Sequence, residues 1–103
     1  HITMKTNLTF DLINGTFQPT EAKNVLFTLI KDKINFHELE MFSAYERYGI
    51  ELPHSKKRVA ELKNALLKIE ETIKEFEKSN ADIQIIGAIE IIAVEKKEKH
   101  EVF

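Results

Sequence analysis

The sequence contains no cysteine and no tryptophan, and only three glycines and two prolines among its 103 residues. Without cysteine the chain cannot form disulfides, thiolate zinc sites or iron–sulfur clusters, and nothing points to an oxidising compartment. We therefore expect a cytoplasmic protein. With 43% hydrophobic and 31% charged residues, the composition is that of one folded, water-soluble domain.

Long hydrophobic runs are also lacking. The longest apolar stretch, residues 83–94, is interrupted by Gln84 and Glu90, and it falls short of the roughly 20 residues that a membrane helix requires. The N-terminus has no apolar region typical of a signal peptide, so we expect no membrane association. Residues 1–3 precede Met4 and are interpreted as a vector remnant, which leaves residues 4–103 as a single domain.

Neither sign of charge dominates the chain. Fifteen Lys and Arg oppose 17 Asp and Glu, for a net charge of -2. A general binder of nucleic acid or of anionic membranes carries a strongly basic balance, so such a role would need a local patch. The last residues, 96–103, form a charged stretch that we expect to be frayed.

Two segments alternate apolar and polar residues, which is the pattern of half-buried strands. The first covers residues 7–13, with Leu8, Phe10 and Leu12 on one side, and is expected to end at Asn14-Gly15. The second is rich in β-branched residues and extends for about 14 residues from Asp82 onward. Its odd positions form the more apolar face: Ile83, Ile85, Gly87, Ile89, Ile91 and Ala93.

Two helices are predicted directly after the first strand. One covers about residues 19–33, because Pro19 favours a helix start and apolar residues follow at helical spacing. The next begins near Phe36, since Asn35 and Glu38 fit a capping box. We expect it to end at Gly49, which suits a left-handed C-terminal cap.

A third helix is predicted over residues 55–79. Its apolar residues are separated alternately by three and four positions, which is the seam of a coiled coil: Val59, Leu62, Leu66, Ile69, Ile73 and Phe76. The order strand–helix–helix–helix–strand predicts an α+β fold with the helices packed on a small sheet.

A mismatch of strand lengths predicts self-association. Seven residues of the first strand span about 23 Å, whereas 14 residues of the last span about 46 Å. Part of the last strand must therefore form a hairpin at Gly87 or pair with a second molecule. We favour a homodimer, because it closes an open edge and buries the even face of the strand. The residues expected in that interface are Ile86, Ala88, Glu90, Ile92 and Val94.

One local run is a candidate anion site. It places cations in the first turn of the third helix, where free backbone N–H groups and positive charge can hold a phosphate or carboxylate. The run has no glycine-rich turn of a phosphate loop. The alternative is a solvated helix start whose Lys side chains point outward or pair with Glu51 or Glu61. The candidate residues are His54, Ser55, Lys56, Lys57 and Arg58.

No other pattern indicates chemistry. The histidines stand in separate segments without a metal-binding spacing, and the serines lie outside any nucleophile turn. Four aromatic residues on or near the second predicted helix are expected to pack into the core: Phe36, Phe42, Tyr45 and Tyr48.

The sequence therefore favours a non-enzymatic interaction protein without metal or cofactor. We expect an adaptor, regulator or inhibitor that forms a homodimer and has a protein partner. The alternative is nucleic-acid or phosphate-ligand binding through residues 54–58.

Overall fold

The computed structural model describes residues 7–95, so residues 1–3 and the charged tail 96–103 lie outside the described range. Along the chain follow β1 (Asn7–Phe17), α1 (Pro19–Tyr48), α2 (Pro53–Lys78) and β2 (Ile83–Ile92). The strands form a two-stranded antiparallel sheet. The predicted α+β class is confirmed, whereas the predicted count of three helices is wrong.

α1 is one helix in the region for which the capping pattern predicts two. It begins at Pro19, where the Gln18 N–H donates to the Glu21 carboxylate at 3.2 Å, and continues through Asn35. Ile34 and His37 are both buried, and this packing outweighs the roughly 0.6 kcal/mol that an exposed asparagine costs in a helix interior.

The turn between the helices begins at the predicted residue. Gly49 adopts a left-handed conformation with φ of 65°, and its N–H donates to the Tyr45 carbonyl at 2.8 Å. α2 then starts at Pro53, whose missing N–H costs nothing in the first helical turn.

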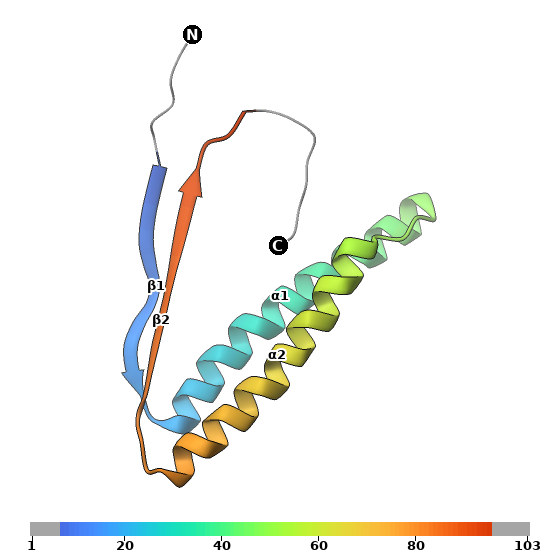
Figure 1. The fold of residues 1–103 in the computed structure, drawn as a ribbon. Helices are drawn as coiled ribbons and strands as arrows, with labels where there is room; N and C mark the ends of the chain where they lie inside the picture. The colour runs from blue at the N-terminus through green and yellow to red at the C-terminus, as the bar shows by residue number, and fades with distance from the viewer. Residues whose placement is uncertain (1–6, 96–103) are drawn as a thin grey trace.

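α1 and α2 lie side by side as an antiparallel hairpin (Figure 1). The predicted seam of α2 is confirmed except at its last residue. Val59 and Leu62 are buried with Ile34, and Leu66 packs against this cluster. Ile73 is buried at the base with Ile69 packed against it, whereas Phe76 is 41% exposed. Two ion pairs also join the helices. Lys23 Nζ lies 3.2 Å from a carboxylate oxygen of Glu70, and Lys63 Nζ lies 3.6 Å from a carboxylate oxygen of Glu38.

The strands differ in length from the sequence prediction. β1 has 11 residues, β2 has 10, and they pair from one end to the other. Asn14 and Gly15 pair with Ile86 and Ile85 instead of ending the strand. The last strand therefore has no half left uncovered by β1, and it passes Gly87 without a hairpin, so the predicted length mismatch is wrong.

A β-bulge in β1 aligns the apolar residues of the ribbon. The pairing passes from Asp11 with Ala88 to Ile13 with Gly87, which leaves Leu12 as the extra residue. The bulge moves the apolar side of β1 from even positions before it to odd positions after it. We call this side of the β1–β2 ribbon its inner face. It carries Leu8, Phe10, Ile13, Gly15, Phe17, Ile83, Ile85, Gly87, Ile89 and Ile91.

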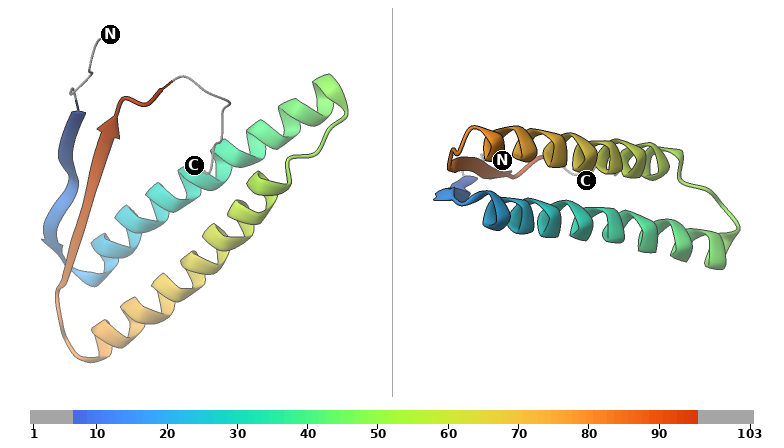
Figure 2. Two further views of the ribbon diagram at one scale, coloured as in Figure 1. Left: turned by 45° about the horizontal axis from the view of Figure 1, so that its top comes forward. Right: turned by 90° about the horizontal axis from the view of Figure 1, so that it is seen from below.

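The ribbon packs on the helices at one end only. There Ile83 and Ile85 are buried with Ala22 and Ile73, and from this base the two arms diverge (Figures 1 and 2). The radius of gyration is 17.7 Å and the principal extents are 53 × 39 × 14 Å. A compact chain of this length has a radius of gyration of about 13 Å, so the arms leave much of each other's surface open.

Candidate self-association surface

The inner face of the ribbon is apolar and largely uncovered beyond the base. Leu8, Phe10 and Ile91 expose 55%, 41% and 53% of their surface, and Ile89 beside them is only partly buried. None of the inner positions carries a charge or a polar side chain. A contiguous exposed apolar surface is typical of sites that interact with a protein, a membrane or a ligand, so the inner face is a candidate functional surface.

α1 carries a second apolar surface, separate from the side that packs on α2. Ile30, Ile34, His37 and Met41 follow spacings of four and three residues, and they belong to or flank the cluster shared with α2. A second series at the same spacings lies on another side of the helix, because each residue turns the helix by about 100°. We call this series, Val25, Leu29, Phe36 and Leu39, the α1 stripe.

The α1 stripe is partly buried at its start and exposed at its end. Val25 and Leu29 line a groove of about 420 Å³ against Leu12 and Ile13 of β1. Phe36 and Leu39, further along the helix, are 46% and 59% exposed. The stripe therefore continues the apolar lining of the β1–α1 junction onto a part of α1 that the described ribbon does not reach (Figure 2).

The interface residues predicted from the sequence lie on the other face of the ribbon. Ile86, Ala88, Glu90 and Ile92 share the outer face, and Val94 follows the end of β2; all five are exposed. On the neighbouring strand they face the polar residues Asn14, Asp11, Thr9 and Asn7. The outer face therefore offers isolated apolar side chains, whereas the inner face is continuously apolar.

The aromatic residues expected in the core are exposed in the single chain. Phe36 belongs to the α1 stripe, and Phe42, Tyr45 and Tyr48 are 64%, 61% and 72% exposed. Tyr45 lines a pocket of about 370 Å³ at the hairpin tip, beside Ile50, Leu52 and Lys56. The expectation of core packing is wrong for these residues, since helical spacing does not say which molecule covers a face.

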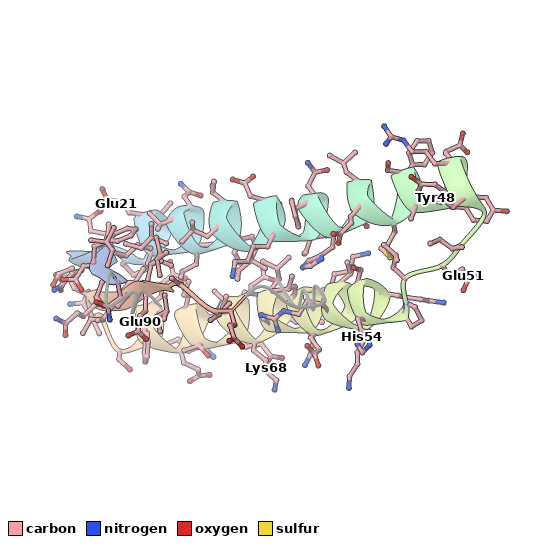
Figure 3. The ribbon with its side chains drawn as sticks, turned by 90° about the horizontal axis from the view of Figure 1, so that it is seen from above. Glu21, Tyr48, Glu51, His54, Lys68 and Glu90 are labelled. Carbon is pink, nitrogen blue, oxygen red and sulfur yellow. The ribbon has the colours of Figure 1, made fainter. Side chains whose placement is uncertain are left out.

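The candidate anion run lies at the same end of the hairpin, where Figure 3 shows His54 on α2, Glu51 in the turn and Tyr48 across on α1. Ser55 is buried, and its hydroxyl donates to a Glu40 carboxylate oxygen at 2.9 Å. Arg58 pairs with Glu61 at 3.2 Å. The structure therefore leaves His54, Lys56 and Lys57 exposed and brings carboxylates to the other two residues.

A buried polar cluster in the hairpin was not apparent from the sequence. His37 is 1% exposed, and its Nδ1 lies 3.5 Å from the same Glu40 oxygen that accepts the Ser55 hydroxyl. The serine thus donates to a carboxylate and not to an imidazole, which differs from the serine–histidine pair of a hydrolase. The spacing of His37 from Ile34 and Met41 was the available signal that it faces α2.

Within residues 7–95, no three or more acidic or histidine side chains gather in a way that could hold a metal ion. None of the helices in that range combines the length and apolar character needed to cross a bilayer. Comparison with protein-family models, curated proteins and solved structures finds no match. The apolar surfaces are the features of this chain that bear most directly on its function.

Proposed function

We propose that this chain is a protein-interaction module that acts as a homodimer and catalyses no reaction itself. The observation that carries the proposal is the exposed apolar surface on both arms of the molecule. Leu8 and Ile91 on the ribbon, and Phe36 and Leu39 on α1, are each about half exposed. Single exposed apolar residues are common, but continuous series on two elements are typical of interfaces.

The size of the core supports the same proposal. In the described part of the chain only seven apolar residues are buried, divided between a cluster at the base and a cluster within the helical hairpin. Ordering about 100 residues costs on the order of 100–200 kcal/mol of conformational entropy. Small domains with little core commonly offset that cost by oligomerisation, and homodimers with two-fold symmetry are the commonest form.

The arrangement of polar groups favours a non-enzymatic role. A catalytic site needs a nucleophile, base or acid in reach of a reacting group within a pocket. In the His37–Glu40–Ser55 cluster, His37 and Ser55 are buried between the two helices and leave only Glu40 partly exposed, at 27%. The tip pocket is lined mainly by apolar side chains with Glu51 and Lys56 as its only charged members.

Anion binding through residues 54–58 receives less support. A phosphate site gains most from several cations and free donors that converge on one point. Here Arg58 is paired with Glu61, and the Ser55 hydroxyl is engaged by Glu40. The Lys56 N–H already donates to the Leu52 carbonyl at 3.0 Å, so fewer donors remain for a ligand.

Size-exclusion chromatography with light scattering tests the proposal. The chain mass is 12.0 kDa, so a dimer has twice that mass, and refractive-index detection is suitable because the chain has no Trp and two Tyr. A dimer mass without absorbance from nucleic acid is expected. A 12.0 kDa species at every concentration overturns the homodimer. Co-purifying nucleic acid that is lost at high salt would favour the anion-binding alternative.

A further inference from the structure

The two uncovered apolar surfaces of this chain complement each other. Among residues 7–95, no helix covers the inner face of the ribbon beyond its base, and no strand covers the exposed end of the α1 stripe. Stable domains consist of packed layers, in which a sheet face or a helix stripe is buried against another element. Each surface is therefore the kind of layer that the other one needs.

We propose that the inner face of the ribbon of one copy packs on the α1 stripe of a second copy, and the reverse contact completes a two-fold dimer. This proposal rests on the homodimer proposed above and assigns the surfaces that form it. In a two-fold dimer, a residue i that contacts j of the partner is matched by j contacting i. The dimer thereby has two identical contacts, each between the ribbon of one copy and the α1 stripe of the other, and all four surfaces are covered.

The dimensions of the two surfaces agree. Beyond the base, the inner face from Gly87 to Ile91 covers four residue steps, or about 13 Å of strand. The stripe from Leu29 to Leu39 covers 10 steps, or about 15 Å of helix. The apolar parts of the ribbon and of α1 can therefore lie against each other over most of their length.

The area available also reaches what a stable dimer requires. Leu8, Phe10, Ile91, Phe36 and Leu39 are 41% to 59% exposed. With their partly buried neighbours, Ile89, Val25 and Leu29, they offer on the order of 600 Å² per copy, taking an aromatic-sized side chain as about 200 Å². Two copies would bury about 1,200 Å², where the range of specific, stable interfaces begins.

Pairing of α1 with α1 is a poorer solution for the stripe. The three- and four-residue spacing of the stripe also passes through position 32, where the chain has the charged residue Asp32 halfway between Val25 and Leu39. A two-fold antiparallel pair of α1 helices centred on the stripe would bring the two Asp32 carboxylates together, which repels. The ribbon offers no charged residue on its inner face, so packing on the ribbon avoids that contact.

Charge complementation tests this arrangement. The ribbon variant carries Leu8→Glu and Ile91→Glu, and the stripe variant carries Phe36→Lys and Leu39→Lys. All four residues are about half exposed in the single chain, so each variant is expected to keep its helical circular dichroism. When either variant is studied alone, the altered surface occurs in both symmetric contacts of its homodimer. We therefore expect the dissociation constant of that homodimer to rise by at least about 100-fold.

An equal mixture of the two variants gives the decisive result. A heterodimer then has one unaltered contact and one in which glutamates of the ribbon face lysines of the stripe. We expect association to return in the mixture and to weaken with salt. The matched control, Ile86→Lys with Ile92→Lys on the outer face, should remain a dimer.

Other outcomes overturn the arrangement and leave the homodimer standing. A ribbon variant that dimerises normally while the stripe variant does not would indicate α1–α1 pairing. A stripe variant that dimerises normally would indicate ribbon–ribbon pairing, and loss of the dimer only in the outer-face control would assign the interface to Ile86 and Ile92. Failure of the homodimer itself shows separately, as a monomeric unaltered protein.

Discussion

At the scale of single residues, backbone conformation separates glycines that look alike in the sequence. Gly49 has a positive φ of 65° at the end of α1, whereas Gly87 lies within β2 and has no positive φ. A Cβ added at either position meets no atom within 4 Å. The two positions therefore differ in backbone requirement and not in available space.

We expect Gly49→Ala to destabilise the protein by about 1 kcal/mol, because a side chain in the left-handed region is strained. Gly87→Ala should be neutral or should stabilise by up to about 1 kcal/mol, since it restricts the unfolded chain at an extended position. Urea unfolding of both variants at one protein concentration measures the difference. Equal effects of the two substitutions would contradict the assigned turn conformation.

Asn35 has opposite roles in the predicted and observed structures. As a helix N-cap, its replacement by alanine would cost about 1 kcal/mol. In the interior of α1, where Asn35 is exposed, Asn35→Ala should instead stabilise by about 0.6 kcal/mol, because alanine is the better helix former. Asn64→Ala, at an exposed interior position of α2, should show a similar gain. Loss of stability on Asn35→Ala alone would mean that a helix starts there.

At the scale of the elements, local patterns predict faces better than boundaries. The apolar side of β2 and the seam of α2 follow from spacing alone, since a strand repeats every two residues and a helix every 3.6. The continuation of α1 through Asn35 was not predictable from the capping pattern, because it depends on the burial of Ile34 and His37. Asn14-Gly15 likewise resembles a turn, yet pairing with β2 keeps both residues in β1.

The sequence also predicts which residues share a surface better than it predicts whether that surface is exposed. Leu8 and Phe10 are identified as one apolar side by their alternation, and the structure places them on the inner face. The sequence cannot show that this face is left open, because that depends on the angle between two arms that meet only at the base. The even face of β2, with Ile86 and Ile92, was therefore the visible candidate for an interface.

The bulge at Leu12 predicts that single-residue deletions in β1 and β2 have opposite effects on the inner face. Deleting Leu12 joins Asp11 to Ile13 and restores regular alternation, so the inner face keeps its residues. Deleting Ala88 moves Ile89 and Ile91 to the outer face, because a shift by one residue reverses every later side chain. We expect the Leu12 deletion to keep the dimer mass and cooperative unfolding and the Ala88 deletion to lose both. A more severe loss from the Leu12 deletion would contradict the register.

At the scale of the whole molecule, the shape itself is an argument for association. A chain of 12.0 kDa whose Cα atoms extend only 14 Å in the thinnest direction is two packed helices thick, since the axes of packed helices lie about 8–10 Å apart. Such a molecule has a small interior, and apolar residues on the inner face of the ribbon and on the α1 stripe stay partly exposed in the single chain. Association is then expected to add to the stability of the folded chain.

This coupling predicts that stability depends on protein concentration. If the folded state is a dimer and the unfolded state is a single chain, a tenfold rise in concentration stabilises the dimer by about 1.4 kcal/mol. The urea midpoint should therefore rise steadily over a concentration series followed by circular dichroism. The stripe variant, Phe36→Lys with Leu39→Lys, should unfold at a lower midpoint that does not change with concentration. A constant midpoint for the unaltered protein would mean that the open two-armed chain is stable alone, and its exposed apolar surfaces would then await a different partner.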